Sequence, residues 1–200
     1  QQAAAGGYSI DNSLRFNDDD SAYLNQTLGT ATNRKIWTWS GWVKRGNLPG
    51  SHFALFSGSV NNCRLSFDDG DNFRIVLDTG SVTDLTSYAK FRDPSAWYHI
   101  VVAVDTTQST NTNRVKVYIN NTQLTWEYTT WCSQNDTCSI NNSTVHYLGR
   151  RLSGLYFDGY MAEVHFIDGQ ALDHTSFGET GDYGEWKPIE VTGMTYGTNG

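Results

Sequence analysis

Paired carboxylates are the first chemistry to look for in this sequence, because two of them roughly 5–10 Å apart across a cleft can cleave a glycosidic bond. The closest approach to such a set is Glu179, Asp182 and Glu185, which lie in a glycine-rich stretch without the alternation of a strand. The serine, cysteine and histidine residues form no nucleophile motif, and the five histidines include no metal-type pair. We therefore expect no catalytic residues and no enzymatic activity.

A second pattern combines aromatic rings with amide and carboxylate groups, as sugar-binding sites do. It lies in the polar stretch 126–144, which is long for a loop between strands. Exposed rings there would form flat platforms, and the polar groups would bond hydroxyls. Alternatively, the two tryptophans of this stretch fold back on a sheet edge or contact a neighbouring subunit. The candidate ligand-binding residues are Trp126, Tyr128, Trp131, Asn135 and Asp136.

The cysteines are the third group that could do chemistry. There are three, Cys63, Cys132 and Cys138, and an odd count does not make a disulfide framework. Cys132 and Cys138 are close enough in sequence to close a small loop by a disulfide in an oxidising compartment. The alternative is two free thiols. Without a matching histidine spacing, zinc binding is not expected.

Composition predicts that strands position these groups. Ser, Thr and Asn together account for 55 residues and Pro for only 3, while seven Trp, eleven Tyr and nine Phe supply a large apolar surface. This balance favours strands joined by polar turns and argues against disorder. The net charge is −7 with no basic cluster, so we expect no nucleic-acid partner. No apolar run approaches the roughly 20 residues of a spanning helix, so we expect no membrane insertion.

Alternation of apolar and polar residues predicts many short strands. The clearest are 36–45, 97–105, 114–120 and 159–167, and the second is apolar on both sides, as in a central strand covered on both faces. The turn Asp68-Asp69-Gly70-Asp71-Asn72 predicts a hairpin. Only Leu172–Phe177 could form a helical turn, with Asp173 as its cap. The fold class is therefore all-β, with one short helical turn near the C-terminus.

The same patterns suggest a division of the chain. Residues 1–12 are a lead segment, 13–178 form one domain, and 179–200, rich in glycine and threonine, are an extended tail or linker. The sequence begins with Gln1 and no methionine. We expect a processed or excised segment, with any targeting signal outside it.

The order of these segments resembles a known family. Ser13-Leu14-Arg15-Phe16, Trp37–Lys44, Trp97–Asp105, Val115–Asn120 and Phe157–Val164 resemble five of its segments, although Asn121 stands where the family's turn has Gly. Together they resemble the laminin-G-like branch of the concanavalin A-like lectin/glucanase superfamily over residues 13–178. The resemblance implies a jelly-roll sandwich of two packed antiparallel sheets. The C-terminal residues, which include Phe177-Gly178-Glu179 and Trp186-Lys187-Pro188, also resemble the corresponding part of this domain in tailed-bacteriophage virion proteins.

The resemblance also implies candidate ions and catalytic groups. Family members often hold one Ca²⁺ at the rim of the sandwich through Asp side chains and carbonyls. The glucanase motif Glu-x-Asp-x-x-Glu is one residue out of register at Glu179–Glu185, which again speaks against an enzyme. Solvated turns are the alternative to an ion site at the aspartates. The candidate metal ligands are Asp18, Asp19, Asp20, Asp105 and Asp158.

These resemblances lead to a hypothesis about function. We expect a non-enzymatic, lectin-like module of a virion surface, in a tail or capsid appendage, that recognises host-surface glycan. Its other partners would be virion subunits, as a homo-oligomer or as part of a larger assembly, in an extracellular setting. A purely structural decoration or oligomerisation domain is one alternative, and a divergent polysaccharide depolymerase is the other.

Overall fold

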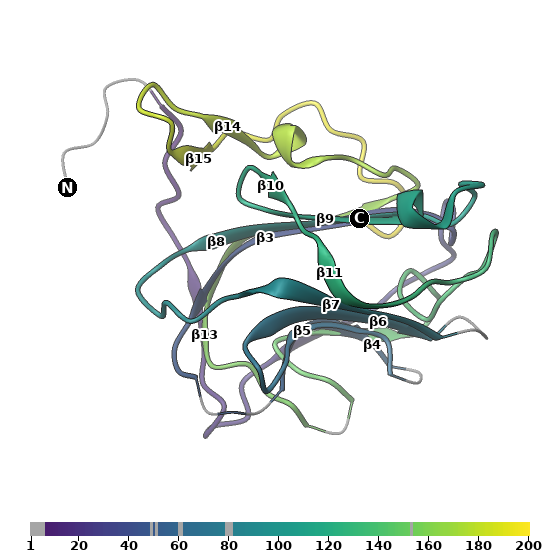
Figure 1. Cartoon of the computed structure of the whole chain (residues 1–200), viewed down its shortest axis with the longest axis horizontal. Coiled ribbons are helices and arrows are strands. Elements are labelled where there is room, and N and C mark those ends of the chain that lie inside the picture. The colour runs from purple at the N-terminus through teal and green to yellow at the C-terminus, as the bar shows by residue number, and fades with distance from the viewer. Residues whose placement is uncertain (1–6, 49, 51, 60–61, 79–81, 153) are drawn as a thin grey trace.

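Two antiparallel sheets packed face to face form the body of the protein in this computed structural model (Figure 1). The structure describes residues 7–48, 50, 52–59, 62–78, 82–152 and 154–200. The first six residues of the predicted lead segment 1–12 lie outside that description. The all-β jelly-roll prediction is confirmed.

Sheet A has six strands in the order β1-β13-β3-β8-β9-β10. Its centre is built from long strands rich in tryptophan, valine and isoleucine, which suit a surface buried on both faces. β8 lies between β3 and β9, so the predicted central strand is confirmed. The strands are β1 (Leu14–Phe16), β13 (Gly159–Asp168), β3 (Ile36–Arg45), β8 (Tyr98–Asp105), β9 (Val115–Ile119) and β10 (Thr122–Gln123).

Sheet B has seven strands in the order β11-β7-β6-β5-β4-β12-β2. The predicted hairpin at 68–72 is confirmed, because Phe67 pairs with Phe73 and the positive φ of Asp71 (66°) closes the turn between β5 and β6. The strands are β11 (Trp126–Thr130), β7 (Val82–Lys90), β6 (Asn72–Asp78), β5 (Arg64–Phe67), β4 (Phe53–Gly58), β12 (Val145–Leu148) and β2 (Leu24–Thr27).

The main core fills the space between the two sheets. Trp37 and Trp39 of β3 are completely buried there, facing phenylalanines and leucines of β4, β5 and β6. Complete burial of one large apolar side chain contributes roughly 1.5–3 kcal/mol, so this layer holds the sandwich together. A one-residue slip of β3 would turn these rings outward, which fixes its register.

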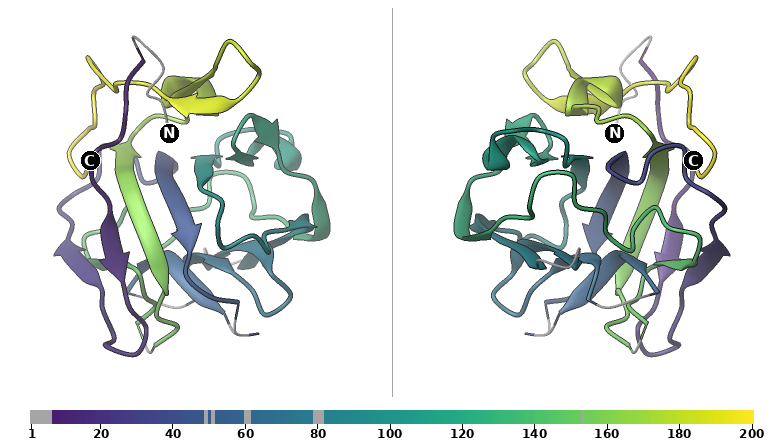
Figure 2. Two further views of the ribbon diagram at one scale, coloured as in Figure 1. Left: turned by 90° about the vertical axis from the view of Figure 1, so that its left-hand side faces the viewer. Right: turned by 90° about the vertical axis from the view of Figure 1, so that its right-hand side faces the viewer.

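A second, smaller core lies on the outer face of sheet A. Val101, Ile167 and Phe177 are buried there, under residues that follow β13. These residues include two strands, β14 (Gly178–Thr180) and β15 (Trp186–Pro188), paired as a hairpin. Figures 1 and 2 show this C-terminal segment (yellow) lying across sheet A, on the side away from sheet B. Both faces of β8 are thus covered, which explains its continuous apolar sequence.

Hydrogen bonds hold the C-terminal segment on the sandwich. The indole N–H of Trp186 donates to His99 Nδ1 at 2.9 Å, and the backbone N–H of Asp168 donates to the carbonyl of Tyr196 at 2.8 Å. The side chain of Asn199 is buried and bonds Asn141. The part of the chain read from the sequence as a tail or linker, 179–200, therefore packs on the jelly roll in these places, while the domain division itself stays a prediction.

Among the residues that the structure describes, helical structure is confined to single 3-10 turns. One is η1 (Asn111–Asn113), and the other is η2 (His174–Ser176), where Asp173 caps the turn by accepting from the backbone N–H of Thr175. The predicted turn and its cap near the C-terminus are confirmed. Among the described residues, no helix is long and apolar enough to cross a membrane.

Candidate functional site

The outward face of sheet B carries two strongly exposed aromatic rings. Tyr88 of β7 is 62% exposed and Tyr128 of β11 is 55% exposed. Tyr128 pairs with Thr86, two residues before Tyr88, so both rings project from the same face of neighbouring strands. Diagonal neighbours of this kind lie roughly 7–8 Å apart, within reach of one small ligand.

Polar groups surround the two rings. Arg74 donates to both carboxylate oxygens of Asp84, from Nε at 2.8 Å and from Nη2 at 2.5 Å, and this bond raises the pKa of Arg74. The Thr130 hydroxyl lies 3.3 Å from the hydroxyl of Tyr128. Strand register places Arg74 opposite Thr86 and Asp84 opposite Thr130. We call this set the tyrosine platform; its members are Arg74, Asp84, Thr86, Tyr88, Tyr128 and Thr130.

Tyr128 is a predicted ligand-binding residue that the structure exposes on the outward face of sheet B. Trp126 and Trp131 are partly buried and pack against the main core. This matches the alternative that the two tryptophans fold back on the protein. Residues 126–130 form an edge strand instead of the start of a long loop, because their aromatic and β-branched side chains suit pairing with β7. A bulge between Trp126 and Tyr128 turns the first ring inward and the second outward.

Asn135 and Asp136 lie in the loop that follows β11, away from the strand pairing that builds the platform. The backbone N–H of Asn135 donates to the carbonyl of Thr106 at 2.7 Å, and the hydroxyl of Thr106 donates to the carbonyl of Asp136 at 2.6 Å. Asn135 takes a positive φ of 67°. Both residues thus fasten the loop to the end of β8, and their role in binding stays a prediction.

The candidate calcium ligands are held in separate local arrangements. Asp20 accepts from Asn17, Asp105 accepts from Thr107 and Gln108, and Asp158 is 2.6 Å from the guanidinium of Arg15. Asp18 and Asp19 are in the same turn as Asp20. Within the described ranges no three His, Cys, Asp or Glu side chains form a group able to hold a metal. The structure does not bring the five aspartates together, and calcium binding stays a prediction.

The disulfide considered between Cys132 and Cys138 is not formed. All three cysteines are buried free thiols. Cys138 instead forms a side-chain hydrogen bond with Cys63, the residue that directly precedes β5. Of the two alternatives left open by the sequence, a loop disulfide and free thiols, the structure contains free thiols.

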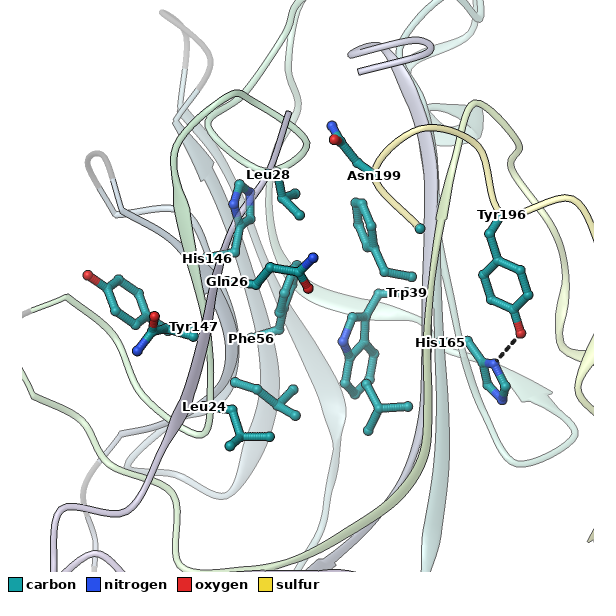
Figure 3. A pocket seen from close by; sticks show the side chains of 15 residues that line it. Leu24, Gln26, Leu28, Trp39, Phe56, His146, Tyr147, His165, Tyr196 and Asn199 are labelled. Atoms are coloured by element: carbon teal, nitrogen blue, oxygen red, sulfur yellow. Dashed lines mark hydrogen bonds between the residues drawn. The ribbon is translucent and has the colours of Figure 1, made fainter. Parts of the chain in front are cut away.

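A cavity of about 420 Å³ opens between the sheets beside β2 (Figure 3). β1 pairs with residues 159–161 of β13, and in the part of the chain that the structure describes no strand pairs with the rest of β13 on this side. Trp39 and Phe56 stack at 6.4 Å across the interior, and Tyr196 bonds His165 Nδ1 at 2.7 Å at the rim. Burial lowers the pKa of His165 although Glu163 opposes it.

The chemistry of this cavity is mostly apolar. Among the described residues, none is a hydrogen-bond partner for the buried indole N–H of Trp39. Gln26 also lines the cavity (Figure 3). A small apolar group carrying one acceptor would suit such a lining better than a polyhydroxylated sugar. No sequence signal predicted the cavity, since strands distant in sequence, chiefly β2, β4, β12 and β13, form it.

The chain is similar to proteins of known family and structure. A laminin G family model, described as the concanavalin A-like lectin/glucanases superfamily, matches residues 16–175. No curated protein sequence matches the chain. Domains LG4-5 of the mouse laminin alpha1 chain superpose with a TM-score of 0.60 at 13% identity, covering 86% of this chain and 46% of that one.

Two further solved structures are similar. A candidate carbohydrate-binding protein of Bacteroides ovatus gives a TM-score of 0.61 at 13% identity, covering 84% of this chain and 46% of that chain. Domain 4 of the arabinanase AbnA from Geobacillus stearothermophilus, solved with arabinotriose, gives 0.53 at 22% identity, covering 76% and 67%. The chain spans about half the length of the laminin and Bacteroides chains. At these identities the likeness establishes the fold alone.

Proposed function

The chain belongs to the concanavalin A-like lectin/glucanases superfamily, and from that premise we propose that it is a non-enzymatic, lectin-like module that binds a glycan on the tyrosine platform. The observation that carries the proposal is the pair of exposed rings, Tyr88 and Tyr128, on one face of neighbouring strands. Aromatic faces pack against the C–H faces of sugars. The Arg74–Asp84 pair and the threonine hydroxyls offer donors and acceptors to the sugar hydroxyls.

The arrangement of the carboxylates supports binding without catalysis. Glu179 pairs with Lys187 at 3.1 Å, and Glu185 accepts from the backbone N–H of Tyr183 at 3.0 Å. Both carboxylates thus stabilise the β14–β15 hairpin. On the platform, Asp84 is engaged in an ion pair with Arg74.

We further propose that the module works on a virion surface, where the glycan belongs to the host and the neighbours are other virion subunits. This part of the proposal rests on the sequence resemblance of the C-terminal residues to tailed-bacteriophage virion proteins. The face of sheet A is covered by the C-terminal segment, and the platform lies on the opposite sheet. Such a division would leave the platform free to meet a cell while the module is built into a particle.

Substitution of the platform tyrosines tests glycan binding. A glycan array with the intact protein identifies a ligand, and titration calorimetry then measures its affinity for Tyr88→Ala, Tyr128→Ala and the double variant. We expect each single change to weaken binding about tenfold, which corresponds to about 1.4 kcal/mol, through loss of ring stacking. Melting temperatures should stay nearly constant because both rings are exposed.

Tyr183→Ala is the matched control, since Tyr183 is 96% exposed on the β14–β15 hairpin. Unchanged affinity in the double platform variant would refute the site. An array without any hit, together with a stable assembly, would favour the structural decoration domain. Release of reducing sugar from host polysaccharide would favour the depolymerase.

A further inference from the structure

Two cysteines far apart in sequence meet in the core. Cys63 lies just before β5 and Cys138 lies in the loop after β11, 75 residues later. Both belong to the main hydrophobic core, and the Cys138 thiol donates a hydrogen bond to the Cys63 sulfur. Cys132, only six residues from Cys138, is buried separately from this core cluster.

Backbone packing fixes the meeting of these two segments. The N–H of Gly58 donates to the carbonyl of Cys63 at 3.3 Å, and a Cβ on Gly58 would lie 2.8 Å from Ser139 Oγ. Gly58 therefore lets the residue after Cys138 approach the β4–β5 connection closely. On the other side, Arg34 Nη2 donates to the carbonyl of Cys138 at 3.0 Å. The loop is thus anchored on both flanks of the thiol pair.

The surroundings of the two thiols give them different acidities. The backbone N–H of Asp78 lies 3.0 Å from Cys63 Sγ and donates to it. The hydrogen bond from Cys138 is the main cause that lowers the pKa of Cys63 to about 6, against the effect of burial. The same bond and complete burial raise the pKa of Cys138. Cys63 is therefore the more acidic thiol of the pair.

We propose that Cys63 and Cys138 form a disulfide bond that ties the loop after β11 to sheet B. The oxidant is a low-molecular-weight or protein disulfide. Because Cys63 is fully buried in the folded protein, the exchange takes place before the loop after β11 packs on sheet B. The Cys63 thiolate attacks one sulfur of this disulfide and expels the other as a thiolate, which takes up a proton. Cys138 then loses its proton and attacks Cys63 Sγ in the mixed disulfide, which releases the second thiol. Two protein thiols become one disulfide, and the oxidant is reduced to two thiols.

Peptide mapping of the intact protein tests the pairing. The protein is refolded from urea with oxidised glutathione and then denatured, so that iodoacetamide reaches every thiol that is still free. Unreduced peptides are analysed by mass spectrometry. We expect a cross-linked peptide that joins residues 63 and 138, with Cys132 alkylated. A peptide that joins Cys132 to Cys138, or alkylation of all three cysteines, would overturn the proposal.

Melting temperature gives a second readout. Because the bond would close a loop of 75 residues, reduction should lower the melting temperature of the oxidised protein by about 5–15 °C. Cys132→Ser should keep this sensitivity to reductant, and Cys63→Ser should lose it. Equal sensitivity in these two variants would contradict the assignment. Neither measurement depends on glycan binding, so failure here leaves the proposed function standing.

Discussion

Acid should destabilise this fold through one buried imidazole. His99 of β8 is 1% exposed and stacks on Trp42 with ring centroids 4.9 Å apart. Its Nδ1 accepts from the indole N–H of Trp186, which leaves the proton on Nε2, 2.9 Å from the Ser40 hydroxyl. Both ring nitrogens are thus satisfied in the neutral form. Burial, with repulsion from His174 and His165, lowers the pKa of His99 to about 3.

The size of the effect follows from linkage. Between pH 6.5 and 3 the unfolded chain binds a proton at His99 that the folded protein does not, so stability falls as the pH falls. An unfolded-state pKa of about 6.5 and a folded pKa of about 3 give a loss of about 2 kcal/mol between pH 7.5 and pH 5, or a lowering of the melting temperature by about 4–8 °C.

Urea denaturation at pH 7.5 and pH 5 measures this loss. His99→Gln is the comparison variant, because an amide can accept from Trp186 and donate to Ser40 without titrating in this range. Other buried histidines, such as His146, whose pKa burial also lowers, contribute equally to both proteins. The wild type should therefore lose about 2 kcal/mol more than the variant. Equal losses of stability in the wild type and the variant would refute the conclusion that the folded protein holds His99 in its neutral form.

Two further substitutions test positions where packing sets the conformation. Gly149→Ala should destabilise the protein by about 2–4 kcal/mol, measured by urea denaturation. The reason is that Gly149 has a φ of +84° and that a Cβ at this position would clash with the ring of Phe16. A loss of stability below about 1 kcal/mol would contradict this prediction. Burial raises the pKa of Asp168, but hydrogen bonds from Asn141 and from backbone N–H groups outweigh it, so the pKa is lowered. The ionised carboxylate therefore stabilises the folded protein above about pH 4, and this contribution is lost as the pH falls further. Asp168→Asn should cost about 2–4 kcal/mol at pH 7 and much less at pH 2, and a loss independent of pH would show that charge plays no part.

The sequence by itself determined the fold class and most of the elements. Period-two alternation identified β3, β9 and β13, and a run of apolar residues on both sides identified β8 as a central strand. The Asp- and Gly-rich turn at 68–72 identified a hairpin, since turn geometry depends on adjacent residues. Tyr128 was also found as a candidate from its neighbours in sequence.

Only the tertiary structure decided which distant residues meet. Tyr88 joins Tyr128 because β11 pairs with β7, and nothing in either segment records that pairing. Cys138 meets Cys63 and not the nearer Cys132, because the loop packs on sheet B. Trp186 covers His99 across 87 residues of chain. Alternation fixes which way a side chain points, but partner choice is a property of the whole packed sandwich, where the contacts of every strand must be satisfied together.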